Sequence, residues 1–371
     1  MTTGMVWTER AMWHDSGNQF GPHSQWLEPM PSPESADSKR RIRHLLDASG
    51  LSEHLTWITP KSADEEALLR VHSLEYLQRI RTTAERGGGN IGTKAATHIG
   101  ANGYELAALA AGGAISAVDA VVSGQVNNAY VLMRPPGHHA ERSDGKGFCI
   151  FNNAAVAARH AQSVHGLKRI ALVDWDAHHG NGAQQIFWDD PTVLAISIHQ
   201  ERAFPQSIGS VEECGADAGL GYTLNIPLPP GSGEGAYLAA MNDVVAPALE
   251  MFEPDLIIVP CGFDAGHLDP TARMLLTSES FRSMTLILKA LAAQLCGGRL
   301  VFVHEGGYAL QSVPFLALAT FEALSGHRTQ VKDPFLSTMQ SLPMQQIQLH
   351  QTMIVEAAAA MLRAHPPKAN R

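Results

Sequence analysis

The segment 168–182, KRIALVDWDAHHGNG, places acidic and imidazole side chains directly after a short apolar run. The run 170–173 has the composition of a buried strand, and Asp176 and His178 follow it two residues apart. Side chains two residues apart in extended backbone point to the same side, so this carboxylate and this imidazole could bind one metal ion. A surface ion pair is the alternative, and a third ligand elsewhere in the chain would favour the metal.

Asp264, in the segment CGFDAGHLDP, is the natural third ligand because it also follows an apolar run, 255–260. Two carboxylates, one imidazole and solvent suit a borderline divalent ion, and we expect one Zn²⁺ per chain. Fe²⁺ or Co²⁺ is the alternative, since oxygen-rich sites select zinc less strongly than thiolate sites do. The chain has four widely separated cysteines, and none is placed to be a ligand.

The adjacent histidines His138 and His139, in RPPGHHA, need a different interpretation because neighbouring residues cannot easily bind one ion together. A neutral imidazole could take a proton from an activated water and return it to a leaving amine. Each ring needs an orienting partner, and Asp174 and Asn181 flank the ligand pair in sequence. A carboxylate partner raises the pKa of its histidine and an amide does not, so the two rings would differ in basicity. A buried, hydrogen-bonded histidine pair without catalytic work is the alternative.

Tyr308 follows two glycines in HEGGYAL, and its hydroxyl could donate a hydrogen bond to an oxyanion opposite the metal. Simple packing of a loop is the alternative for a tyrosine in this position. His179, although adjacent to His178, is expected to be structural.

Elements that could position these residues follow a regular rhythm along the chain. Near-continuous apolar strands alternate with helical segments, which is typical of a parallel sheet covered on both faces. Polar clusters come directly after five of the strands, and ligands in open α/β sheets bind outside the carboxyl ends of the strands. The expected strands are 129–133, 169–174, 193–198, 222–226, 255–260 and 299–304, and the expected helices are 104–124, 152–165, 235–251, 278–296 and 351–365, with another that begins near Ser35.

Composition narrows the class of protein. The 371 residues are 45% hydrophobic and 17% charged, which suits one large globular α/β domain. The formal net charge of −9 and the absence of a Lys/Arg block argue against direct nucleic-acid binding. No secretory signal and no apolar run of about 18 residues stand out, so we expect a cytoplasmic protein with no membrane contact and free thiols.

Two long polar segments, 14–36 and 83–103, are expected to be loops that shape the entrance to the site.

Taken together, RPPGHHA, GFCIFNNAAVAA, DWDAHHGNG, SIHQ, CGFDAGHLDP and HEGGY, in this order, resemble the histone deacetylase superfamily. The class II-like bacterial histone deacetylase-like amidohydrolases are the most similar group. The resemblance implies the arginase–deacetylase α/β fold, with a central, mainly parallel sheet of eight strands and helices on both faces. It implies one catalytic domain over 1–371, with a motif core at 131–308 and a C-terminal helical tail at 327–371.

The resemblance also implies residue roles. Asp176, His178 and Asp264 match the zinc ligands, His138 and His139 the tandem catalytic histidines, and Tyr308 the transition-state tyrosine. Asp174 matches the partner of the first histidine, and Asn181 stands where class II enzymes carry Asn. The substrate channel would be lined by Phe148, Gly147 and Phe204. The family often carries two K⁺ sites, matched here by an inner set (Asp174, Asp176, His178, Ser197, Ile198) and an outer set (Phe187, Asp190, Val193, Tyr222), although these residues could simply build the turn.

The related arginases hold two Mn²⁺ ions with additional aspartates two residues beyond the shared ligands. This chain has Gly180 and Gly266 at those positions, which favours a one-metal hydrolase over a binuclear ureohydrolase. A non-catalytic acyl-lysine binder would be expected to lack a ligand, a catalytic histidine or Tyr308, and all are present.

We therefore predict zinc-dependent hydrolysis of a secondary amide to a carboxylate and an amine. In this mechanism the metal and Tyr308 polarise the carbonyl, and His139 takes a proton from water and passes it to the leaving amine. Acyl-lysine peptides and small N-alkyl or N-acyl amides are the expected substrates, with acetylpolyamines as the alternative. Polyamine-selective relatives can carry a Glu where this chain has Thr271, and Glu28, Glu34 or Glu105 could replace it from a loop. The resemblance implies a homo-oligomer, a dimer or tetramer, with the Ala-rich C-terminal helix as a contact.

Overall fold

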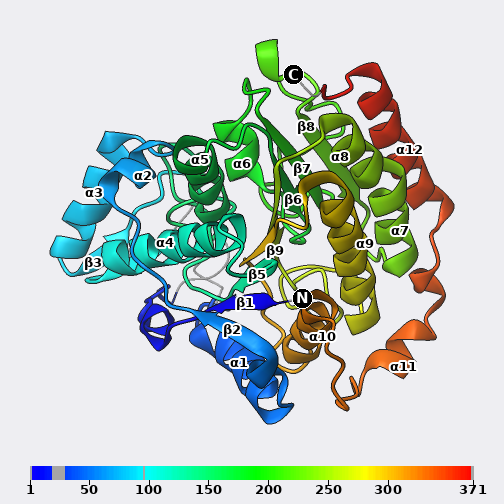
Figure 1. The fold of residues 1–371 in the computed structure, drawn as a ribbon, viewed down its shortest axis with the longest axis horizontal. Coiled ribbons are helices and arrows are strands. Elements are labelled where there is room, and N and C mark those ends of the chain that lie inside the picture. Colours follow the sequence, from blue (N-terminus) through cyan, green and yellow to red (C-terminus); the bar gives the residue numbers. More distant parts are fainter. Residues whose placement is uncertain (1, 19–29, 95–96, 369–371) are drawn as a thin grey trace.

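The computed structural model describes residues 2–18, 30–94 and 97–368, and its centre is an eight-stranded sheet (Figure 1). The strand order is β2-β1-β5-β10-β9-β6-β7-β8, and every pair in this sheet is parallel. The expected parallel sheet is confirmed. The strands are β1 (Thr3–Val6), β2 (Leu55–Ile58), β5 (Asn128–Val131), β6 (Ile170–Asp174), β7 (Val193–Gln200), β8 (Thr223–Leu228), β9 (Leu256–Cys261) and β10 (Leu300–His304).

The strands followed by polar clusters are β5, β6, β7, β9 and β10, and these five are neighbours in the sheet. Because all strands run in the same direction, their carboxyl ends meet at one edge. Residues separated by more than 100 positions in sequence therefore arrive at the same place.

Helices cover both faces of the sheet. In Figure 1, α4 and α5 lie on one face, while α7, α8 and α9 lie on the other. Alternate strand residues divide between two hydrophobic cores, so that Val131 packs beneath the α4 side and Tyr130 on the opposite side. The helices are α1 (Ala36–Ala48), α2 (Glu65–Leu69), α3 (Leu74–Glu85), α4 (Gly103–Val122), α5 (Asn153–His165), α6 (Asn181–Ile186), α7 (Glu234–Ala240), α8 (Ala246–Phe252), α9 (Ser278–Cys296), α10 (Val313–Ser325), α11 (Leu336–Gln340) and α12 (Leu349–Ala364), with a π turn (Met241–Val245) joining α7 to α8.

Helices α1 and α4 form where the sequence predicts helices, near Ser35 and over 104–124. Ser35 caps α1 by accepting a hydrogen bond from the Asp37 backbone N–H. Helix α4 is long and apolar enough to cross a membrane by length and composition, but 67% of that window is buried inside the protein. A Cβ at Gly112 would lie 1.8 Å from the carbonyl oxygen of Lys61, so small residues let α4 pack closely as a core helix.

The structure can be compared with the two expected loops and with the C-terminal helix. Segment 83–103 contains the end of α3 and an antiparallel hairpin, β3 (Gly88–Asn90) with β4 (His98–Gly100). The expectation of a loop over 14–36 falls partly on residues 19–29, which lie outside the described residues. In the C-terminal tail, Ala358 and Ala359 of α12 are buried against the chain's own fold, whereas Ala357, Ala360 and Ala364 are exposed, as are the larger apolar side chains of Leu349 and Met353. The four cysteines are buried free thiols.

Candidate active site

The carboxyl ends of β6 and β9 bring Asp176, His178 and Asp264 together. The Nδ1 atom of His178 lies 2.9 Å from Asp264 Oδ2 and 3.2 Å from Asp176 Oδ1. One ligand atom from each residue lies within 4.8 Å of the others, a spacing that would let all three reach one ion. Burial and the neighbouring Asp176 carboxylate raise the pKa of Asp264 to about 8. Two carboxylates this close in a dry site are the arrangement that a divalent cation stabilises.

Backbone N–H groups and glycines hold these carboxylates in place. Asp264 Oδ1 accepts from Ala177 N–H at 2.8 Å, and Asp176 Oδ2 accepts from Gly306 N–H at 2.8 Å. A Cβ at Gly306 would lie 2.3 Å from Asp264 Oδ2, and one at Gly262 would lie 2.1 Å from Asp176 Oδ2. Glycine is required at both positions because the backbone itself packs against the carboxylates.

The tandem histidines have unlike partners. His138 Nδ1 lies 2.9 Å from Asp174 Oδ2, and His139 Nδ1 lies 2.7 Å from Asn181 Oδ1. Burial disfavours a charged His138, but the Asp176 and Asp174 carboxylates outweigh burial and raise its pKa to about 10. Burial lowers the pKa of His139 well below its usual value, and a positive charge on His138 lowers it further. The pKa values of the two rings are therefore shifted in opposite directions.

Glu305 is part of this site and was not singled out from the sequence, although HEGGY contains it. Its Oε2 accepts hydrogen bonds from the backbone N–H groups of Gly137 at 2.6 Å and His138 at 3.0 Å. Burial raises the pKa of this carboxyl to about 7. Glu305 thereby ties the loop after β10 to the turn that carries both histidines.

Tyr308 lies at the mouth of the site and is fixed through its backbone. Its N–H donates to Asp269 Oδ2 at 2.8 Å, and the same Asp269 side chain caps the turn at Thr271. Burial and the nearby Asp264 and Asp176 carboxylates raise the pKa of the phenol well above 10. The hydroxyl therefore stays protonated and can act only as a neutral donor. Sequence reasoning missed Asp269 because its contact with Tyr308 spans 39 residues.

The expected channel residues are arranged around His139 and Tyr308. The ring centroids of Phe148 and Tyr308 are 6.1 Å apart with an interplanar angle of 65°, and those of Phe204 and His139 are 4.9 Å apart with an angle of 86°. Gly147 has a φ of +52°, and a Cβ there would lie 2.3 Å from His139 Cδ2. No carboxylate stands at Thr271, whose hydroxyl donates to Asp269 Oδ1 at 2.6 Å.

The residues matched to monovalent-cation sites are placed differently in the two sets. In the inner set, Asp174 and Ser197 pair across β6 and β7, and both border a cavity of about 10 Å³, which is about the smallest that can hold one water. Ile198 follows Ser197 in β7.

In the outer set, the Asp190 carboxylate accepts from Thr192 and is paired with the Arg159 guanidinium at 2.7 Å. Phe187 lies under that same guanidinium, Val193 begins β7, and the Tyr222 hydroxyl bonds to Lys368.

The glycines that replace the arginase aspartates have no room for a side chain. A Cβ at Gly180 would lie 2.5 Å from Asp174 Oδ2, and one at Gly266 would lie 2.3 Å from Leu316 Cδ1. His179 is turned away from the metal ligands, with Nε2 3.1 Å from Gln184 Oε1 and a pKa lowered by burial to about 4.

Glu34 is buried, which is inconsistent with the expectation that it could act as a gatekeeper. Its carboxylate is paired with the Arg134 guanidinium at 2.6 Å and the Lys39 ammonium at 2.8 Å, and its side chain is fully buried. Its negative charge is therefore already compensated. Glu105 is exposed on α4 and lies 3.9 Å from Arg10, while Glu28 lies outside the described residues.

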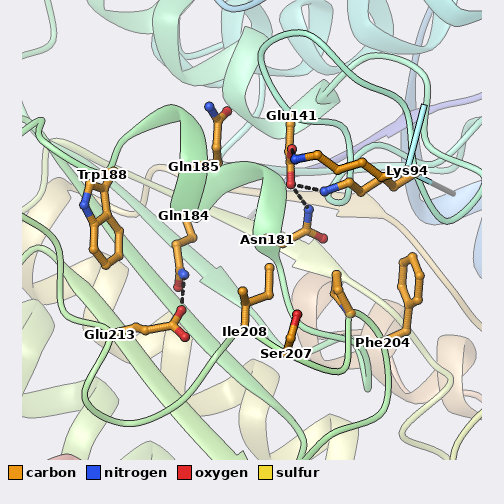
Figure 2. A pocket seen from close by; sticks show the side chains of 12 residues that line it. Lys94, Glu141, Asn181, Gln184, Gln185, Trp188, Phe204, Ser207, Ile208 and Glu213 are labelled. Carbon is orange, nitrogen blue, oxygen red and sulfur yellow. Dashed lines mark hydrogen bonds and ion pairs between the residues drawn. The ribbon is translucent and has the colours of Figure 1, made fainter. Parts of the chain in front are cut away.

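A cavity of about 680 Å³ lies on the outer side of Asn181 and Phe204 (Figure 2). Figure 2 shows Lys94 and Asn181 both directed at the carboxylate of Glu141, and Gln184 directed at Glu213. The cavity is lined by Lys94, Glu141, Lys146, Asn181, Gln184, Gln185, Trp188, Phe204, Pro205, Ser207, Ile208 and Glu213.

Comparisons with known proteins identify the family of this chain. The histone deacetylase domain matches residues 32–324. A histone deacetylase-like amidohydrolase of Pseudomonas aeruginosa is 47% identical over 341 residues, covering 90% of this chain and 88% of that protein. Human polyamine deacetylase HDAC10 is 38% identical over 314 residues, covering 81% of this chain and 46% of that protein. The crystal structure of the HDA15 HD domain superposes with a TM-score of 0.85 at 31% identity, covering 99% of this chain and 98% of that one. The chain belongs to the histone deacetylase family.

Proposed function

We propose that this protein is a zinc-dependent amidohydrolase that cleaves a secondary amide of the N-acetyl-lysine type, or a small N-acyl amide, into a carboxylate and an amine. The family consists of deacetylases and amidohydrolases and is metal-dependent. The observation that carries the proposal is the convergence of Asp176, His178 and Asp264 beside two histidines that have a carboxylate and an amide as their partners. That combination supplies a metal position and a neutral base within one buried site.

Zinc fits this donor set. Two carboxylates and one imidazole leave a coordination position open for water or substrate, and no thiolate is needed. When bound there, the ion polarises the amide carbonyl and lowers the pKa of a water molecule. The crowding at Gly180 and Gly266 supports one ion per chain rather than two.

His139 is the residue we assign to proton transfer. Its imidazole is neutral, so it can accept the proton of the attacking water and then deliver it to the departing nitrogen. The Nδ1–H bond to Asn181 leaves Nε2 free as the basic atom. His138, held cationic by Asp174, contributes positive charge beside the developing oxyanion.

Tyr308 is assigned to the carbonyl oxygen. Its neutral hydroxyl can donate one hydrogen bond to the oxygen as negative charge develops there. Phe148 and Phe204 are assigned to the two walls of a narrow apolar passage that a linear side chain can enter. Aromatic walls hold the methylene chain of an acylated lysine without requiring a charged partner.

The substrate preference follows from the charges at the entrance. Thr271 carries no charge and Glu34 is already paired with two cations, so neither residue offers the free carboxylate that a second substrate amine would need. This favours acyl-lysine peptides and small N-alkyl amides over acetylpolyamines. Because the HDAC10 relative is named a polyamine deacetylase, an acetylpolyamine belongs among the substrates to be tested.

A substrate panel tests this proposal. Acetyl-lysine peptide, trifluoroacetyl-lysine peptide, acetyl-putrescine and an N-methyl amide would be compared by kcat/KM on metal-replete protein. We expect the lysine or N-methyl substrates to exceed acetyl-putrescine by at least about tenfold. A preference for acetyl-putrescine would contradict the substrate class, and no hydrolysis of any member would contradict the activity.

Two further assignments belong to the same proposal. Residues 1–371 would act as one catalytic domain, with the tail 327–371 packed through α12 onto β8 and α7. The inner set around Asp174 and Ser197 would hold one K⁺, whereas the outer set is weakened by the Arg159–Asp190 pair.

A further inference from the structure

The amide of Asn181 makes hydrogen bonds on both of its sides. Its Oδ1 faces His139 Nδ1 at 2.7 Å. Its Nδ2 donates to the backbone carbonyl of His139 at 3.2 Å and to Glu141 Oε1 at 3.0 Å. An amide can present either atom to a neighbour, because its oxygen and nitrogen have nearly the same size. The neighbours of Asn181 therefore decide which atom faces the histidine.

Glu141 is the neighbour that permits only one orientation. If the amide turned by half a rotation, Asn181 Oδ1 would face a carboxylate oxygen and a carbonyl oxygen, neither of which can donate. The turned amide would also present N–H groups to His139 Nδ1 and force that atom to be the acceptor. The proton of the neutral ring would then lie on Nε2, and the ring could no longer accept a proton there.

Glu141 is itself held in place from several directions. Its carboxylate contacts the ammonium of Lys146 and lies 3.7 Å from that of Lys94, as Figure 2 shows for Lys94. Its backbone carbonyl lies 3.0 Å from His72 Nδ1, and its N–H donates to the Asp144 carbonyl at 2.9 Å. Because His72 Nε2 accepts from a backbone N–H at 3.0 Å, its Nδ1 carries the proton and donates to Glu141. The carboxylate is thus charge-compensated and fixed.

We propose that Glu141 is a positioning residue that fixes the Asn181 amide and thereby sets the Nδ1–H tautomer of His139. This inference rests on the proposed role of His139 as the base. It adds a relay that begins in the outer cavity, at Lys94 and Lys146, and ends at the reacting atom, His139 Nε2. Glu141 acts through Asn181, whose side chain joins it to His139.

The substitution Glu141→Gln tests the relay with little change of shape. A glutamine can accept from, or donate to, Asn181, so both amide orientations become available. We expect kcat to fall about tenfold while KM changes less than about twofold. The matched control is Glu213→Gln in the same cavity, because Glu213 accepts from Gln184 and has no link to His139. Loss of kcat by the control to the same extent would contradict the relay.

The double substitution Glu141→Gln with Asn181→Asp separates positioning from structure. A carboxylate at position 181 accepts from His139 Nδ1–H in any rotation, and it repels Glu141. In this background Glu141→Gln should raise kcat, whereas it lowers kcat in the natural sequence. A structural role for Glu141 predicts a loss in both backgrounds, and that result would overturn the inference.

Nitrogen-15 NMR of histidine-labelled holoenzyme gives a readout that does not depend on activity. The His139 signal, assigned by its disappearance in His139→Gln, should report Nδ1–H in the natural protein and a mixture with Nε2–H in Glu141→Gln. An unchanged tautomer would overturn the inference about Glu141. A changed tautomer with unchanged kcat would instead contradict the role of His139 in the proposed function.

Discussion

His138 Nδ1 lies 2.9 Å from Asp174 Oδ2 in a buried site, and the Asp176 and Asp174 carboxylates together raise the pKa of His138. The second ring meets an uncharged amide instead, at Asn181. The pKa values of the two neighbouring rings are therefore shifted in opposite directions.

Replacing Asp174 with Asn should reduce this difference. The Asp176 carboxylate would remain, but one of the two carboxylates that outweigh burial would be lost, so the pKa of His138 should fall. We expect kcat to fall about 10- to 100-fold, the usual effect of losing a buried partner of a catalytic residue. An NMR titration of His138 checks the cause, and a pKa that stays near 10 in the variant would show that Asp174 is not responsible.

Tyr308→Phe removes one hydroxyl and leaves the ring that packs near Phe148. Because the donor to the oxyanion is lost, kcat should fall about 10²- to 10³-fold with an unchanged melting temperature. Steady-state kinetics and thermal denaturation measure the two effects. The control is Tyr104→Phe. It also removes one tyrosine hydroxyl, which accepts a hydrogen bond from Arg81. Near-natural turnover by Tyr308→Phe would contradict the assigned role.

Gly180→Asp restores an arginase-like carboxylate in sequence but should not create a second metal site. The added Cβ would lie 2.5 Å from Asp174 Oδ2, so the side chain collides with the partner of His138. We expect a loss of at least about 2 kcal/mol in the free energy of unfolding and still one metal per chain. Elemental analysis combined with urea denaturation measures both. Two bound metals with restored stability would be the contrary outcome.

Glu34→Gln should destabilise the protein in a pH-dependent way. Burial alone would raise the pKa of Glu34, but Arg134 and Lys39 outweigh it and hold the pKa well below 4.5. A depressed carboxyl pKa adds stability above the unfolded value near 4.5, and that stability is lost as the pH falls below it. The variant should therefore be about 3–5 kcal/mol less stable at pH 7, with a smaller difference below pH 4.

Urea denaturation of both proteins at several pH values measures that difference. Glu105→Gln is the control, because the Glu105 side chain is 76% exposed and its removal should change stability by less than about 0.5 kcal/mol. A Glu34→Gln difference that grows as the pH falls would have the wrong sign for this ion-pair network.

The parallel sheet and its polar edge were predictable because continuous apolar runs and the clusters after them are local patterns. Strands β1 and β2 were missed, since TGMV and LTWI are four-residue segments without a distinctive run. These strands form because β1 pairs with β5 and β2 pairs with β1.

The metal set and the histidine partners could be proposed from spacing, because Asp174, Asp176, His178 and Asn181 belong to one short segment. Glu305 and Asp269 could not, because their contacts with the histidine turn and with Tyr308 join different strand ends. The same limit explains Glu34, which the sequence places in a polar loop. Its burial depends on Arg134, 100 residues away.

The central claim is that a single zinc ion at Asp176, His178 and Asp264 supports amide hydrolysis. The most direct measurement titrates metal-depleted protein with Zn²⁺ while following acid release from the best substrate of the panel. The account predicts that activity rises linearly to one equivalent of zinc per chain and then stays constant. A rise that continues to two equivalents, or no hydrolysis at any zinc concentration, would contradict it.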